Sequence, residues 1–118
     1  MLWLKVGIGF SLLTVLIGAF GSHGLKQILI RNDTLDIFQI AVRYQMFHSI
    51  GIILSGILQL MNIITNQISS ILFSIGILVF SGSLYLLAIT GLKWLGAITP
   101  IGGVLFIAGW VTLLLALR

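Results

Sequence analysis

The stretch ISSILFSIGILVFSGSLYLLAI, residues 68–89, decides the fold class because it contains no charged side chain. A helix of about 20 apolar residues crosses a hydrocarbon core about 30 Å thick, so this stretch is long enough to span a bilayer. Three further stretches are similarly long and apolar, and the four predicted spans are residues 3–22, 44–62, 68–89 and 95–117. The sequence therefore predicts an all-α polytopic membrane protein, in which residues 1–118 form one domain of four transmembrane helices in a compact bundle.

The composition leaves little material for a water-soluble domain or for conventional catalysis. Hydrophobic residues make up 59% of the chain and charged residues 7%, which is too little polar surface to cover a soluble globule. The absence of cysteine excludes disulfides, thiolate metal sites and a cysteine nucleophile. There is no glutamate, and neither aspartate lies in a predicted span, so no carboxylate pair or Ser-His-Asp triad can be assembled. We therefore expect a protein that is not an enzyme and has no metal site or cofactor.

The net charge of +4 comes from cations placed near the ends of the predicted spans. Cations in such positions anchor helices at phospholipid headgroups, so we expect membrane lipids and no nucleic acid as partners. The side of the first and third loops carries Lys26, Arg31, Arg43 and Lys93, and the side of the termini carries Lys5 and Arg118. The positive-inside rule then predicts termini outside and the first and third loops in the cytoplasm. A cleaved signal peptide is the alternative interpretation of residues 1–21, because Lys5 precedes an apolar run that ends in small residues.

The first loop predicts a further helix between the first and second spans. Asp33 is a suitable N-cap residue, and Asp36 follows three positions later as in a capping box. Apolar residues then recur from Leu35 at helical spacing, opposite charged and polar residues. We expect a short interfacial amphipathic helix at residues 34–43. The alternative is that these residues begin one long second helix.

Small residues predict the helix-packing faces, because close approach rather than the hydrophobic effect drives helix association in lipid. The residues expected at these contacts are Gly7, Ser11, Gly18, Gly21, Gly51, Ser55 and Gly103. A separate small face at Ala108, Thr112 and Ala116 predicts association with a second copy or a larger membrane complex. Pro100 predicts a kink or a late start of the fourth helix, because proline lacks an N–H group and crowds the preceding turn.

Two histidines suggest a candidate site at the cytoplasmic ends of the helices. A polar cleft formed by His23, Arg43, Tyr44, His48 and Thr99 could bind a lipid headgroup or a quinone-like molecule. Haem ligation by the two histidines is disfavoured, because one of them lies beside glycines at a frayed helix end. The alternative is that the polar residues only show where the helices meet the membrane surface.

Five motifs follow one another along the chain: GAFGSHGLK (18–26), AVRYQMFHS (41–49), FSGSLYLLAITG (80–91), LGAITPIGG (95–103) and FIAGW (106–110). In this order and spacing the chain resembles domain of unknown function family 423, the YgdD-like small bacterial membrane proteins, which are related to the eukaryotic transmembrane protein 256 group. The resemblance implies a four-helix protein of the bacterial inner membrane with no established activity and no assigned site residues. The function that we expect is an accessory or scaffold role, and ligand binding in the polar cleft is the alternative.

Overall fold

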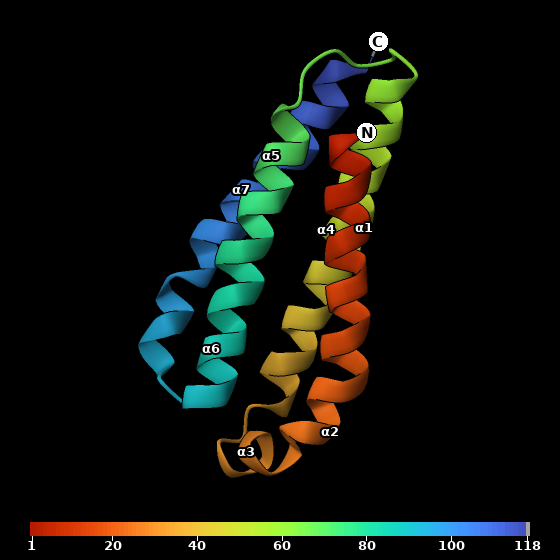
Figure 1. Cartoon of the computed structure of the whole chain (residues 1–118). Coiled ribbons are helices and arrows are strands. Elements are labelled where there is room, and N and C mark those ends of the chain that lie inside the picture. Colours follow the sequence, from red (N-terminus) through yellow and green to blue (C-terminus); the bar gives the residue numbers. More distant parts are fainter. Residues whose placement is uncertain (118) are drawn as a thin grey trace.

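The computed structural model describes residues 1–117 and is helical almost throughout (Figure 1). Arg118, one of the two cations assigned to the side of the termini, lies outside the described residues. The elements are α1 (Leu2–Leu16), π-helical turn η1 (Ile17–Gly21), α2 (Ser22–Gly24), α3 (Lys26–Arg31), α4 (Leu35–Leu60), α5 (Ile68–Gly76), π-helical turn η2 (Ile77–Ser81), α6 (Gly82–Thr90), 3₁₀ helix η3 (Lys93–Ala97) and α7 (Thr99–Ala116).

Four continuous helical segments are long and apolar enough to cross a membrane, which confirms the predicted fold class. They are Leu2–Gly24, Leu35–Leu60, Ile68–Thr90 and Lys93–Ala116. Successive segments pack side by side, so that α1 lies along α4, and α5 lies along α7 (Figure 1). The principal extents of 49 × 26 × 16 Å show that the bundle has an elongated cross-section.

Glycine allows the first two spans to approach very closely. A Cβ atom on Gly7 would lie 2.9 Å from the backbone nitrogen of Ile53, and one on Gly56 would lie 3.1 Å from that of Leu4. Gly56 therefore contributes to the same α1/α4 contact as Gly7, although it was not among the residues expected there. Backbones this close gain van der Waals contact that bulkier side chains would prevent.

The third and fourth spans are joined by a reciprocal pair of phenylalanines and glycines. The ring of Phe106 in α7 occupies the space beside Gly76 in α5, where a Cβ would lie 2.5 Å from the ring. In return, the ring of Phe73 in α5 lies over Gly109 in α7, where a Cβ would be 2.6 Å away. Both phenylalanines are buried, so each ring fills the gap left by the glycine of the other helix.

Gly102, and not the expected Gly103, makes the closest approach between α7 and η2. A Cβ on Gly102 would lie 2.5 Å from the backbone nitrogen of Phe80, whereas the nearest atom to a Cβ on Gly103 is 3.9 Å away. Successive residues of a helix point about 100° apart, so a shift of one residue changes the face. Gly103 instead borders the groove described below.

Polar side chains connect the helices inside the bundle. The Gln45 amide nitrogen donates to the carbonyl oxygen of Phe10 in α1 at 3.2 Å, and its oxygen accepts a bond from the Tyr85 hydroxyl in α6 at 2.6 Å. Nearer the other end, the hydroxyl of Ser55 in α4 is hydrogen-bonded to those of Ser69 and Ser70 in α5. Within residues 1–117, every buried side-chain nitrogen or oxygen has a hydrogen-bond partner.

The residues expected to form a separate interfacial helix are the first turns of α4. One unbroken helix runs over Leu35–Leu60, as the alternative interpretation proposed. The short helix between the first two spans is instead α3, Lys26–Arg31, which lies across the end of the bundle (Figure 1). Helical hydrogen bonding continues from the expected interfacial helix into the second span because residues 35–60 contain no proline that would break it.

The predicted N-cap at Asp33 is wrong. Asp33 has a φ of 52°, and the N-cap position belongs to Thr34, whose side chain does not cap α4. The Thr34 hydroxyl donates to the carbonyl oxygen of Ala88 at 2.7 Å, and the Asn32 amide donates to that oxygen and to the one of Ile89. These bonds satisfy carbonyl groups left free at the C-terminal end of α6. The loop is therefore shaped by the third span, which local sequence does not reveal.

The late start predicted for the fourth helix is confirmed. The segment begins as the 3₁₀ helix η3, and α7 starts at Thr99 with Pro100 in its first turn. Proline is well suited to this position because the N–H groups of the first turn have no partner within the helix.

Candidate functional site

A groove of about 510 Å³ opens on the surface between α4 and α7. Both helices pack against the third span, and Phe80 of η2 lies on the floor between them. The groove is lined by Arg43, Tyr44, Phe47, His48, Phe80, Gly103, Phe106, Ile107 and Trp110. Its volume lies within the range of small-molecule sites, about 300–1,000 Å³.

His48 is buried in the wall of the groove and both of its ring nitrogens are hydrogen-bonded. Its Nε2 lies 3.0 Å from Nε1 of Trp110, and its Nδ1 lies 2.8 Å from the carbonyl oxygen of Tyr44. Tryptophan can only donate, so we assign Nε2 as the acceptor and Nδ1 as the protonated donor of a neutral imidazole. The ring also stacks on Phe106 with centroids 3.5 Å apart. His48 therefore links α4 to α7 and has no free donor for a ligand.

Aromatic rings form the rest of the groove surface. Tyr44 stacks on Phe80 with ring centroids 4.5 Å apart, and Phe47 lies against Trp110 at 5.2 Å. Tyr44 is 44% exposed and Phe47 is 59% exposed, so both present apolar surface outwards. Such walls suit a hydrocarbon chain or a planar ring, and they offer few hydrogen-bonding groups.

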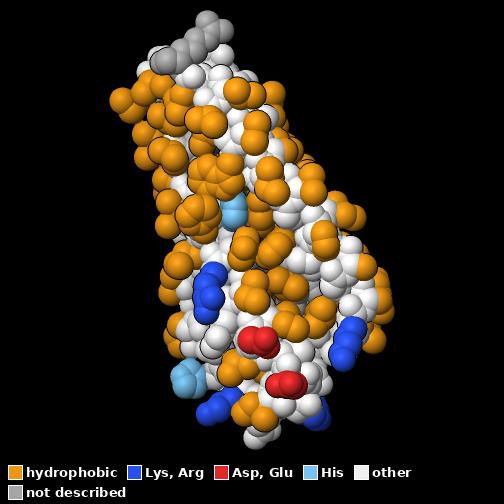
Figure 2. All heavy atoms as spheres, turned by 180° about the vertical axis from the view of Figure 1, so that it is seen from behind, with side chains coloured by type: hydrophobic (Ala, Val, Ile, Leu, Met, Phe, Trp, Pro, Cys, Tyr) orange, Lys and Arg blue, Asp and Glu red, His pale blue; other side chains and the backbone are white. Residues whose placement is uncertain are grey.

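Arg43 supplies the positive charge of the groove. It is exposed on α4, next to Tyr44 and towards the loop end of the helix. The closest acidic residue in the same helix is Asp36, which precedes it by seven residues, or about 10 Å along the axis. Figure 2 shows charged side chains gathered towards one end of the visible face, while hydrophobic side chains cover the remainder. Arg43 is thus available to an anionic group at one end of an otherwise apolar groove.

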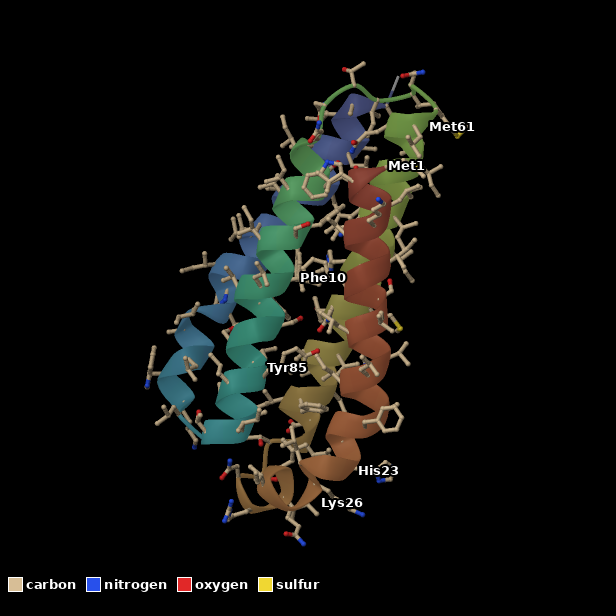
Figure 3. All side chains as sticks on the ribbon, in the orientation of Figure 1. Met1, Phe10, His23, Lys26, Met61 and Tyr85 are labelled. Carbon is tan, nitrogen blue, oxygen red and sulfur yellow. The ribbon has the colours of Figure 1, made fainter. Side chains whose placement is uncertain are left out.

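The structure brings three of the five expected site residues together and places the other two elsewhere. His23 is exposed in α2, at the loop end of the bundle (Figure 3). His48 lies thirteen residues after the start of α4, about 20 Å along its axis, because α4 begins nine residues before the expected span. The two histidines therefore do not share one membrane level. Thr99 is hydrogen-bonded to Ser83 of α6 at 2.7 Å and does not line the groove.

The aromatic residues that face Tyr44 and His48 were not among the expected site residues. Phe106 and Trp110 are four residues apart on α7, as Tyr44 and His48 are on α4, and this spacing puts each pair on one helix face. The spacing predicts that each pair shares one face of its own helix. It does not reveal that these two helix faces lie opposite each other. Within residues 1–117, no three His, Cys, Asp or Glu side chains gather closely enough to hold a metal ion.

Each π-helical turn borders a hollow on the molecular surface. Phe80 of η2 lies on the floor of the groove, and Gly18 of η1 lines a smaller hollow on the other side of α4. A π-helical turn interrupts the regular hydrogen bonding of an α-helix and frequently occurs at functional sites. The local irregularities of the first and third spans thus coincide with two of the hollows on the molecular surface.

The fold and the groove define an α-helical, multi-span membrane protein with a lateral, aromatic groove. The chain belongs to the family described as protein of unknown function (DUF423), whose model matches residues 17–103. Among its relatives is the UPF0382 membrane protein SH2409 of Staphylococcus haemolyticus, 42% identical over 115 residues that cover 98% of this chain and 93% of that protein. The UPF0382 membrane protein YwdK of Bacillus subtilis is 41% identical over 108 residues, covering 90% of this chain and 87% of YwdK. No solved structure matches the chain.

These relatives confirm the membrane class and the resemblance to family 423, and their names describe them only as membrane proteins. The family match includes α4 and η2 and ends at Gly103, so it covers two of the three elements around the groove. The chain is accordingly an integral membrane protein of no established activity.

Proposed function

We propose that this protein is a non-enzymatic accessory protein of the bacterial cytoplasmic membrane, and that it binds an amphipathic membrane molecule in the groove between α4 and α7. The observation that carries the proposal is the composition of the groove, which combines one exposed cation with continuous aromatic walls. A ligand with a hydrophobic chain and an anionic or carbonyl-bearing head matches this combination. Arg43 would hold the head, and the exposed Tyr44 would provide a neutral hydroxyl beside it.

The opening of the groove favours a ligand that arrives from the lipid phase. Ile107 and Phe47 are more than half exposed at its rim, and neither could face water at low cost. A membrane molecule could enter sideways between the two helices without crossing the charged loops. His48 would then act by holding the walls together rather than by contacting the head of the ligand.

The distribution of charge supports the expected orientation. Lys26, Arg31, Arg43 and Lys93 belong to the end where the first and third loops lie, and the two termini lie at the opposite end (Figure 1). The positive-inside rule then places α3 in the cytoplasm and both termini outside. In this orientation the polar end of the groove faces the cytoplasmic leaflet.

Two glycine variants test the groove. In Gly103→Leu a side chain would extend into the groove, since Gly103 borders it and the nearest atom to its Cβ is 3.9 Å away. Gly9→Leu is the matched control, because a Cβ on this exposed α1 glycine meets no atom within 4 Å and Gly9 does not line the groove. Native mass spectrometry of the purified proteins should show amphiphiles retained by the wild type and by Gly9→Leu but lost from Gly103→Leu. Equal retention by all three proteins would refute the proposal.

Association with a second copy or with a larger membrane complex is a separate proposal. The face expected to mediate it is half-buried within the single chain, and Ala116 packs against the hydrophobic core. Thr112 donates its hydroxyl to the carbonyl oxygen of Gly109 and so needs no partner from another chain. Crosslinking followed by mass spectrometry at native expression tests the proposal, and the recovery of monomers alone would count against it.

A further inference from the structure

A second hollow of about 300 Å³ lies on the other side of α4 from the groove. It is lined by Gly18, Ser22, Phe38, Gln39, Val42 and Arg43, so that η1 and α2 contribute one wall and α4 the other. Arg43 lines both this hollow and the aromatic groove. Its side chain therefore lies on the ridge between a partly polar hollow and an apolar one.

The smaller hollow contains the hydrogen-bonding groups that the groove lacks. Gln39 is exposed and precedes Arg43 by one helical turn, which places both side chains on the same face of α4. An arginine fork and an amide N–H₂ group can together donate several hydrogen bonds to one phosphate. The Ser22 hydroxyl donates to the carbonyl oxygen of Gly18 at 2.8 Å, so its oxygen can still accept a bond from a headgroup hydroxyl.

We infer that the two hollows bind one anionic glycerophospholipid. Arg43 and Gln39 hold its phosphate, the hollow beside Ser22 receives the rest of the headgroup, and one acyl chain lies in the aromatic groove. This inference rests on the proposed function, and it specifies the ligand and adds a headgroup site outside the groove.

The direction of the groove favours a phospholipid over a quinone. From Arg43 the groove runs to His48 and Trp110, which lie further along their helices towards the middle of the bundle. A phospholipid of the same leaflet has its phosphate at the surface and its chain pointing to the bilayer centre, so it fits without reorientation. A quinone has no charged headgroup that would occupy the polar hollow. The charge of Arg43 is complementary to the phosphate, and basic pockets between transmembrane helices commonly bind anionic headgroups.

The test compares two lipids with identical acyl chains, phosphatidylglycerol and phosphatidylcholine, added in equal amounts to the delipidated, detergent-solubilised protein. Native mass spectrometry reports the ratio of the two bound lipids. We expect the wild type to prefer phosphatidylglycerol, and Arg43→Gln to reduce this preference about fivefold, the effect of one basic residue at an anionic surface. Gln39→Ala should reduce it less. Lys26→Gln is the control, because it removes a cation from α3 at the same end of the bundle without altering either hollow.

The outcomes separate the inference from the proposed function. If Gly103→Leu lowers the binding of both lipids while Arg43→Gln leaves their ratio unchanged, the groove binds lipid but the headgroup site is refuted. The site is also refuted if Lys26→Gln lowers the ratio as much as Arg43→Gln does, since the effect would then be general electrostatics. If Gly103→Leu changes nothing, the proposed function itself fails. A thermal unfolding scan of each variant identifies any loss of fold, and Arg43→Lys, which keeps the charge but not the fork, should then give an intermediate ratio.

Discussion

Replacement of Gly102 by alanine should destabilise the bundle, whereas the same change at Gly103 should not. A Cβ at residue 102 would lie 2.5 Å from the backbone nitrogen of Phe80 and 2.7 Å from its Cα, and ordinary contact begins at 3.4 Å. The obstacle is backbone, which no change of rotamer can move, so α7 and η2 must separate by about 0.9 Å, the difference between 3.4 and 2.5 Å. At residue 103 the nearest atom is 3.9 Å away, in the Phe80 ring, and the methyl group fits.

The two substitutions isolate the cost of that separation. Both replace glycine by alanine in the same turns of α7, so both gain the same helix propensity, about 1 kcal/mol. Overpacking costs about 1–3 kcal/mol, and Gly102→Ala should therefore unfold with a free energy lower than that of Gly103→Ala by about this amount. Equilibrium unfolding in mixed micelles, followed by circular dichroism, measures the difference. Equal stability of the two variants, or a more stable Gly102→Ala, would show that the close contact between α7 and η2 is wrong.

Three further predictions concern hydrogen bonds and orientation. A double-mutant cycle with His48→Phe and Trp110→Phe should give a coupling free energy of about 0.6 kcal/mol, the average for hydrogen bonds between transmembrane helices, and no more than about 1.7 kcal/mol; a coupling of zero would exclude the bond. Gln45→Leu should lower the unfolding free energy by about 1–3 kcal/mol because it leaves the hydroxyl of the half-buried Tyr85 without its acceptor, and the effect should nearly vanish in a Tyr85→Phe background. A reporter that is active only in the cytoplasm should be inactive when fused to the C-terminus, and strong activity there would reverse the proposed orientation.

The four spans could be predicted because length and apolar composition are local properties. A stretch such as residues 68–89 has only one stable environment for its backbone, a helix in lipid. The position of Pro100 was equally informative, because its effect on the first turn of α7 depends on its own ring and not on a partner. Asp33 shows the limit of this reasoning. Its sequence context satisfies the rules for an N-cap, but the hydrogen bonds that fix the loop connect Thr34 to Ala88, more than fifty residues away.

The candidate site was only partly predictable for the same reason. Arg43, Tyr44 and His48 fall within two turns of one helix, so the sequence places them together without any knowledge of the fold. The inclusion of His23 required two helix ends to lie at one level, and this depended on where α4 begins. The aromatic side of the groove depended on which face of α7 turns towards α4, a property that small residues at 102 and 103 leave ambiguous. A span can be predicted from one segment of sequence, whereas the residues that pack together depend on two helices at once.

The reciprocal contact between FSIG in α5 and FIAG in α7 fixes the axial register of the last two spans. In an antiparallel pair, sliding one helix by a turn would withdraw both rings from their glycines at once and drive each ring against a bulkier neighbour. The two helices therefore have one low-energy alignment, and it uses residues from these two spans alone. Such a hairpin can reach its final alignment as soon as both of its helices have entered the bilayer, without waiting for α1 and α4. The groove lies along the seam where this hairpin packs against the amino-terminal pair.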